Sequence, residues 1–371
     1  MRNPFKPTFG ANPPLLAGRN ELIMEFVDAL ADGPGASGRA TLYTGARGAG
    51  KTVMLNAIQA EAEAQGWLAI SETATDGLVD RLTQSRLPEV LRQFDPDAVR
   101  KRLTGIELPL KGGGLTWETL EPHVAKADLR SQINLLTDLL TENETGLLIT
   151  LDEIHRGQIV ELREVATTVQ HAFREDREVA LAAAGLSSSV SDLLNDDILT
   201  FLRRAERHHL GPVDLDQVRR ALKDPIDEAG RQVSADALDL MVEGTQGYPF
   251  LIQLVGAHCW RVRRDADSIS LEDAETGVAS ARRRLGSLVH APALADTSDV
   301  DKSFLLAMAK DDGPSKMADI AKRLEVDKKY AGIYRRRLID AELIEAAGYG
   351  HVDFTIPYLR EYLRDHAAAN I

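Results

Sequence analysis

The chain contains a single cysteine among its 371 residues, which excludes an intramolecular disulfide framework. Cys259 lies within an apolar helical pattern, where a lone cysteine is usually a small core residue. No apolar run is long enough to span a membrane, and Met1–Lys6 lacks the apolar core of a signal peptide. These absences predict a cytoplasmic protein with no membrane partner.

The chain also has no excess of positively charged residues. The formal net charge is −13, which disfavours nonspecific adhesion of the whole chain to nucleic acid. Hydrophobic residues make up 44% and charged residues 27%, as in soluble globular proteins, and the length allows two or three domains. Any contact with DNA must therefore come from a local basic patch.

A phosphate-binding loop motif stands between an expected strand at 40–44 and an expected helix that begins near Val53. The motif consists of Gly45, Ala46, Arg47, Gly48, Ala49, Gly50, Lys51 and Thr52, and these residues together with Val53 are candidates for binding the nucleotide. Glycines let backbone N–H groups curl around phosphate oxygens, and the helix N-terminus adds its positive end. We expect Lys51 to reach the outer phosphates and the Thr52 hydroxyl to hold Mg²⁺.

A second motif is the apolar run 146–151, which is followed by Asp152 and Glu153. A continuous apolar run is typical of a strand buried on both faces, and ligands bind where such strands end. We expect Asp152 to hold Mg²⁺ through water and Glu153 to polarise the attacking water. The alternative is a strand that ends in two solvated acids, which the upstream loop disfavours.

Strands alternate with helices through the first two hundred residues, which predicts a parallel sheet. The fold class is therefore α/β, a P-loop NTPase three-layer sandwich. Residues 75–145 contain two helical stretches and an expected β-hairpin at 103–110. The predicted domains are a P-loop core (1–212), a helical lid (213–286), a linker (287–299) and a C-terminal module (300–371).

The C-terminal module resembles a winged helix, with three helices followed by two strands around a glycine-rich tip that carries Tyr349 and His351. Between Lys316 and Arg337 there are eight basic residues against three acids. The candidate DNA-binding residues are Lys316, Lys328, Lys329, Arg335, Arg336 and Arg337. Two alternatives stay open: winged helices also mediate protein contacts, and arginines at a helix end complement the helix dipole.

Taken together, the motifs resemble those of AAA+ ATPases of the initiator-related clade, an origin-recognition-like, archaeal type of ATPase close to the STAND signalling ATPases. Three further segments carry the resemblance: Pro13–Arg19, Phe201–Pro212 and Gly247–Leu251. It implies an adenine-binding segment at 3–20, with Leu16, Gly18 and Arg19 at the adenine and Pro249 against the base. ATP or ADP and Mg²⁺ are the implied cofactors.

The resemblance also implies a sensor at Ser187, where the family more often has Asn or Thr. It makes Arg203, Arg204 and Arg207 candidates for an arginine finger offered to a neighbouring subunit; the alternative is that they are surface arginines or pair with Glu206. The lid lacks a clear second-sensor arginine, which favours a slow switch over a vigorous motor.

The sequence thus predicts an ATP-hydrolysing switch that couples its nucleotide state to double-stranded DNA and to ATP-dependent self-association. The alternative is a signalling ATPase whose winged helix docks on protein and binds no DNA. A third possibility, a scaffold that binds nucleotide without hydrolysis, is disfavoured by the pair Asp152 and Glu153.

Overall fold

The computed structural model describes residues 2–93, 128–194 and 199–366, apart from Phe9, Arg156, Gln158 and Asp296. The hairpin expected at 103–110 lies outside these residues. Among the described helices, none combines the length and the apolar character that a membrane crossing needs.

Five parallel strands form the sheet of the N-terminal core, in the order β2-β3-β4-β1-β5. They are β1 (Ala40–Thr44), β2 (Leu68–Thr73), β3 (Leu147–Asp152), β4 (Val179–Gly185) and β5 (Glu206–His209). All of β4 is buried, and β3 is buried up to its last residue, because both strands are covered on two faces. The parallel sheet predicted from the apolar runs is confirmed, and the ends of β3, β4 and β1 lie side by side at one edge.

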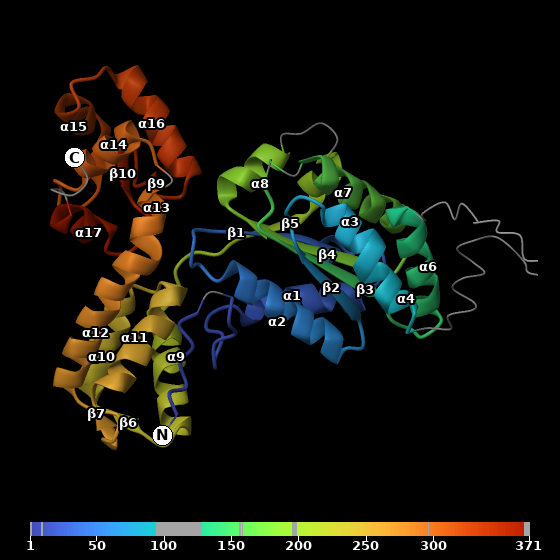
Figure 1. The fold of residues 1–371 in the computed structure, drawn as a ribbon, viewed down its shortest axis with the longest axis horizontal. Coiled ribbons are helices and arrows are strands. Elements are labelled where there is room, and N and C mark those ends of the chain that lie inside the picture. The colour runs from blue at the N-terminus through green and yellow to red at the C-terminus, as the bar shows by residue number, and fades with distance from the viewer. Residues whose placement is uncertain are drawn as a thin grey trace, which may run out of the picture.

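Helices cover both faces of this sheet and make three layers (Figure 1). One face is covered by α1 (Asn20–Ala31) and α2 (Lys51–Ala64), which share a buried cluster with Leu148. The other face, toward which Ile149 points, carries α3 (Leu78–Arg81), α4 (Leu87–Leu91), α6 (Leu129–Thr141), α7 (Ile159–Arg174) and α8 (Ser187–Leu194). The carboxyl edge of the strands stays open, which is where parallel sheets bind ligands.

Four helices follow the sheet as a lid: α9 (Leu215–Glu228), α10 (Ala235–Thr245), α11 (Pro249–Val262) and α12 (Leu271–Leu285). Three of them begin at a side-chain cap, since Asp214, Ser234 and Ser270 each accept a hydrogen bond from a backbone N–H of the first turn. The parallel strands β6 (Gln232–Val233) and β7 (Ser268–Ile269) pair at one end of the lid. All four helices fall within the segment 213–286 that was predicted as the lid.

The segment 287–299, expected as a linker, is mostly helical. After α12 the chain makes a π-helical turn (Gly286–His290) and enters α13 (Ala291–Ala295). Val289 and Leu294 are buried in a cluster that also contains residues of the lid and of the C-terminal module. This segment therefore packs the two parts against each other.

The C-terminal module is a winged helix, as predicted. Its helices are α14 (Asp299–Met308), α15 (Met317–Arg323), α16 (Lys328–Asp340) and α17 (Leu359–Asp365), and its strands are β8 (Ser315–Lys316), β9 (Ile344–Ala346) and β10 (His351–Phe354). We expected two strands, but β8 pairs with β10 and makes a third. Lys316 therefore ends a strand directly before α15.

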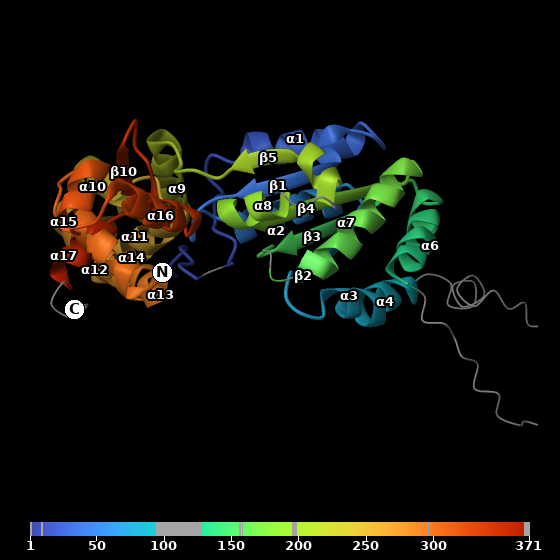
Figure 2. The ribbon, with the colours of Figure 1, turned by 90° about the horizontal axis from the view of Figure 1, so that it is seen from above.

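The lid and the winged helix form one column beside the N-terminal core (Figures 1 and 2). They share a continuous hydrophobic cluster that runs from α9 to α17. The Tyr358 hydroxyl of the winged helix donates a hydrogen bond to the Gly244 carbonyl of the lid at 2.9 Å. Arg282 of the lid lies 4.2 Å from the centre of the Tyr358 ring. These contacts make the column a single packed unit.

His290 makes this junction sensitive to acid. Its side chain is buried, and Nε2 lies 2.8 Å from the Pro357 carbonyl. Burial lowers the pKa of His290 to about 4, whereas an unfolded histidine titrates near 6.5. Between these values the unfolded chain binds a proton that the folded chain excludes, so stability falls as the pH falls from about 6.5 toward about 4.

We expect His290 to cost about 2 kcal/mol of stability at pH 5 relative to pH 7.5. Urea unfolding at both pH values gives the free energy of unfolding of the wild type and of His290→Gln. The cost is the amount by which the change in this free energy between the two pH values is smaller in the variant. Asp273 and Asp311, whose pKa values are held at about 2 by their arginine partners, titrate below this range. An equal pH dependence in the variant would contradict the assignment to His290.

Candidate functional site

The loop between β1 and α2 has the conformation that its glycines permit. Gly45, Gly48 and Gly50 have φ of 154°, 78° and 92°, in the region that favours glycine. Gly45 also lies close to the Leu210 carbonyl oxygen, since a Cβ at position 45 would be 2.7 Å from that oxygen. Gly50 caps α2, so the loop directs backbone N–H groups from the helix start toward the open edge of the sheet.

Lys51 folds back over this loop. Its Nζ donates hydrogen bonds to the carbonyl oxygens of Gly45 at 2.6 Å and of Ala46 at 3.0 Å. Burial lowers the pKa of Lys51, whereas the carboxylates of Glu342, Asp152 and Glu153 act to raise it. The ammonium is thus held by backbone carbonyls in a pocket of acidic groups, from which it can turn to a phosphate.

Thr52 and the acids at the end of β3 meet across the sheet edge. The Thr52 hydroxyl donates a hydrogen bond to Asp152 Oδ2 at 2.6 Å, and the other carboxylate oxygen accepts from the Glu153 N–H at 2.8 Å. Mg²⁺ at phosphate sites takes one or two protein oxygens and fills the rest of its octahedron with phosphate and water. The hydroxyl and carboxylate oxygens fit this ion, and Glu153 is exposed beside them.

A cavity of about 860 Å³ opens at this edge. Predicted residues on its lining are Leu16, Arg19, Arg47, Gly48, Ala49, Gly50, Lys51, Thr52, Val53, Asp152, Glu153 and Pro249. The structure thus brings together the phosphate loop, the acidic strand end, the N-terminal segment and the lid proline. The volume is ample for a nucleotide, since ligand pockets of small molecules range from about 300 to 1,000 Å³.

The N-terminal segment supplies the wall opposite the sheet. Gly18, with φ of 65°, packs a little behind this wall, where a Cβ would lie 3.1 Å from Val213. Arg19 Nη2 donates a hydrogen bond to the Gly211 carbonyl at 2.5 Å, and burial lowers the pKa of this guanidinium. Farther upstream, Asn3 Nδ2 donates to the Ala257 carbonyl at 3.2 Å, which attaches the segment to α11 of the lid.

Tyr248 contacts the phosphate loop. The sequence did not predict this contact, although Tyr248 lies within the segment Gly247–Leu251 named above. Its buried hydroxyl donates a hydrogen bond to the Arg47 carbonyl and lies where a Cβ of Gly48 would be. Gly48 is therefore required by the lid as well as by the loop. Because 201 positions separate Tyr248 from Arg47, no local pattern marks this pair.

Other lining residues were not predicted. They include His155 beside the acidic strand, Phe250 and Gln253 in α11, and Leu288 and Pro292 in the helical linker. A proline or an apolar residue in a helix carries no sign of which cavity it lines. Only the fold brings these positions to the loop.

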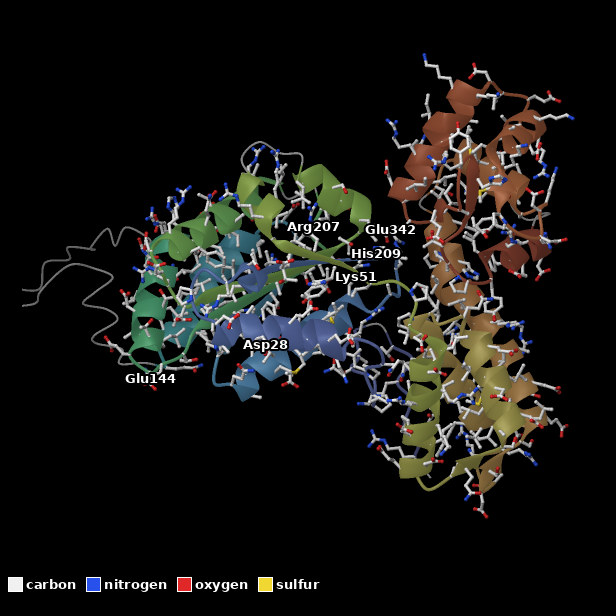
Figure 3. The ribbon with its side chains drawn as sticks, turned by 180° about the vertical axis from the view of Figure 1, so that it is seen from behind. Asp28, Lys51, Glu144, Arg207, His209 and Glu342 are labelled. Atoms are coloured by element: carbon white, nitrogen blue, oxygen red, sulfur yellow. The ribbon has the colours of Figure 1, made fainter. Side chains whose placement is uncertain are left out.

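The three candidate finger arginines lie on the outside of the core. Arg203 and Arg204 end the 3-10 turn Leu199–Arg204, and Arg207 lies on the edge strand β5 (Figure 3). All three side chains are exposed, and Arg203 Nε donates to the Leu194 carbonyl at 2.6 Å. This position suits contact with a neighbouring molecule, and the finger role stays a prediction.

Ser187 begins α8 directly after β4, so it lies at the sheet edge as expected. Its backbone N–H donates a hydrogen bond to Glu342 Oε1 of the winged helix at 2.5 Å. The residue predicted as the sensor is thus contacted by a carboxylate from another part of the chain, and its sensor role stays a prediction. The acid was not foreseen, because 155 positions separate the two residues.

The basic residues of the winged helix are not equivalent. Lys328 and Lys329 are exposed at the start of α16, and Arg336 is exposed farther along. Lys316 is exposed beside the wing and Arg335 is half-buried. Arg337 is also exposed, and it forms an ion pair at 2.7 Å with the buried Asp301, so this side chain both stabilises the module and reaches its surface.

The comparison with protein families identifies two segments. Residues 15–181 match a family model described as an AAA ATPase domain. Residues 287–363 match one described as a domain of unknown function, DUF8462. No curated protein sequence matches the chain.

Solved structures resemble the chain over nearly its whole length. A Walker-type ATPase of Pyrococcus abyssi is 18% identical, with a TM-score of 0.65 over 94% of this chain and 96% of that one. The ORC2 protein of Aeropyrum pernix, in its ADPNP–ADP complexes, is 15% identical, with a TM-score of 0.62 over 98% and 97%. Its ADP form matches with 15% identity and a TM-score of 0.52 over 99% of both chains. At these identities the likeness shows a common fold.

Proposed function

Since residues 15–181 form an AAA ATPase domain in a chain with the fold of origin-recognition ATPases, we propose that the protein is a molecular switch that binds and hydrolyses ATP. In this proposal the nucleotide state controls association with double-stranded DNA through the winged helix. The observation that carries it is one cavity lined by Lys51, Thr52, Asp152 and Glu153.

The proposed site works by neutralising and positioning charge. Lys51 leaves the loop carbonyls for the outer phosphates, and the loop N–H groups bind the remaining oxygens. Thr52 and Asp152 hold Mg²⁺, which neutralises phosphate charge when bound. Glu153 orients the water that attacks the terminal phosphate.

The adenine is proposed to lie between the N-terminal segment and the lid. Leu16 and Arg19 come from one side and Pro249 from the other. A nucleotide that touches both parts fixes their relative position, and a ligand shifts a conformational equilibrium only through such differential contacts. Calorimetry with Mg–ADP and a phosphate-release assay with Mg–ATP test binding and hydrolysis separately.

The proposed DNA contact uses the exposed lysines at the start of α16. We expect the double variant Lys328→Glu/Lys329→Glu to weaken duplex binding by at least about tenfold at low salt and to flatten its salt dependence, because phosphate contacts release counterions. Fluorescence anisotropy at two salt concentrations measures both effects. Arg337 is left intact, since its loss would leave Asp301 buried without its partner.

A matched control changes the same charge elsewhere. Arg174→Glu/Arg220→Glu alters two exposed arginines of the core and the lid. If this control weakens binding as much as the lysine variant, net charge and not the winged helix governs DNA affinity.

A second candidate function is a signalling ATPase whose winged helix docks on protein. It is favoured by the contact of α16 with α8, which places the recognition helix of the winged helix against the core. Absence of duplex binding in the nucleotide-free, ADP and ATP-analogue states would select this candidate. In the first proposal, the exposed side chains of the candidate finger arginines serve ATP-dependent self-association.

A further inference from the structure

A carboxylate of the winged helix contacts the core beside the cavity. Its partner there is Ser187, whose neighbours Leu186 and Ser189 line the cavity. Glu342 follows α16 in a left-handed conformation, with φ of 54°, at the turn into β9. Its side chain is buried, and Oε1 accepts the hydrogen bond from the Ser187 N–H. Figure 3 shows Glu342 at the junction of the winged helix and the core, on the side where Lys51 lies.

The Glu342 carboxylate lies in surroundings that would also suit a phosphate group. Ser187 opens α8, whose N-terminus favours negative charge. It follows β4, the strand between the phosphate-loop strand β1 and the acid-bearing strand β3. The carboxylates of Glu342, Asp152 and Glu153 all act to raise the pKa of Lys51. Glu342 thus lies within the electrostatic reach of the ammonium expected to bind the outer phosphates.

The contact is incompletely satisfied. Glu342 Oε2 and Ser187 Oγ are both buried and have no hydrogen-bond partner among the residues that the structure describes. A buried carboxylate with an unpaired oxygen is costly unless nearby positive charge compensates it. Lys51, whose pKa the Glu342 carboxylate acts to raise, supplies positive charge on this side, and a nucleotide would engage it.

We propose that the contact of Glu342 with Ser187, here called the Glu342 latch, holds the winged helix on the core until ATP binds. The inference rests on the proposed function and deepens it by naming the regulator of the same site. The terminal phosphate of ATP draws Lys51 away and adds negative charge beside the carboxylate, which expels Glu342. ADP lacks that phosphate and leaves the latch closed.

Release moves more than one side chain. The winged helix and the lid share one hydrophobic cluster, so α16 leaves α8 together with the lid. The end of α16 next to Glu342 then separates from α8, whereas Lys328 and Lys329 at its start are already exposed. The latch thus links the number of phosphates on the nucleotide to the position of the winged helix on the core.

The first test needs no nucleotide. Hydrogen exchange of the Ser187 amide is measured in the full chain for the wild type, Glu342→Ala and the control Glu345→Gln, an exposed acid of the same module. We expect Glu342→Ala to speed exchange by at least about tenfold, the loss of one hydrogen bond to a charged acceptor. Glu345→Gln should exchange at the wild-type rate. Equal protection in Glu342→Ala overturns the latch.

The second test measures affinity for Mg–ADP and for a non-hydrolysable ATP analogue by calorimetry. Glu342→Gln, which keeps the shape and removes the charge, should bind the analogue about tenfold more tightly, a usual size of coupling between sites. Its ADP affinity should change by less than about twofold. An unchanged preference between the two nucleotides overturns the nucleotide control.

The two proposals fail in different ways. Normal nucleotide binding with unchanged Ser187 exchange in Glu342→Ala overturns the latch alone. A wild-type chain that binds neither nucleotide overturns the proposed function, and with it the nucleotide control, even where exchange shows the contact itself.

Discussion

Replacing Lys51 by alanine removes nucleotide binding. Lys51 is half-buried at the phosphate loop, and the partners of its ammonium there are the carbonyls of Gly45 and Ala46, which it can exchange for phosphate oxygens. Hydrogen bonds between charged groups contribute about 1.5–3 kcal/mol each. We therefore expect the dissociation constants of Mg–ADP and Mg–ATP to rise by at least about 100-fold in calorimetry.

The control for this variant is Lys310→Ala, which removes an exposed lysine of the winged helix. It should bind both nucleotides as the wild type does. Thermal unfolding without nucleotide checks that Lys51→Ala is folded, since the loop carbonyls that lose their donor can turn to water in the cavity. Wild-type affinity in a folded Lys51→Ala protein would refute the assignment of the cavity to nucleotide.

The parts of this molecule that sequence could predict are those encoded by neighbouring residues. The loop Gly45–Thr52 needs glycine at positions of positive φ, and these glycines are visible as a motif. The buried strands β3 and β4 are apolar along their length because both faces are covered. Local patterning therefore sufficed for the sheet, the lid helices and the residues that face the cavity from the loop.

The parts that sequence could not predict depend on residues far apart in the chain. Tyr248 meets the Arg47 carbonyl and Glu342 meets Ser187 only after the lid and the winged helix have packed. The ion pair of Arg337 with Asp301 was likewise not predicted when Arg337 was included in the basic patch, and the DNA contact of this exposed side chain stays a prediction. A helix surface shows which side chains are charged but not which of them a distant helix neutralises.

Changing Glu153 to glutamine leaves ATP bound and stops its cleavage. Glu153 is exposed at the cavity directly after Asp152, so its carboxylate can face a water beside the terminal phosphate. An amide of the same size keeps the shape and cannot act as a base. Removing a general base usually costs about 10²–10⁴-fold in rate, and we expect phosphate release to fall within that range.

Glu144 offers a matched control, because it is exposed and has a left-handed backbone with φ of 57°, close to the 56° of Glu153. Figure 3 places it at the far end of the core from Lys51. Glu144→Gln should hydrolyse ATP as the wild type does, so any effect of glutamine at such a backbone position is separated from the chemistry. Equal turnover in Glu153→Gln and the wild type would contradict the catalytic role. A loss of ATP binding in Glu153→Gln would instead assign Glu153 to holding Mg²⁺ and not to orienting the water.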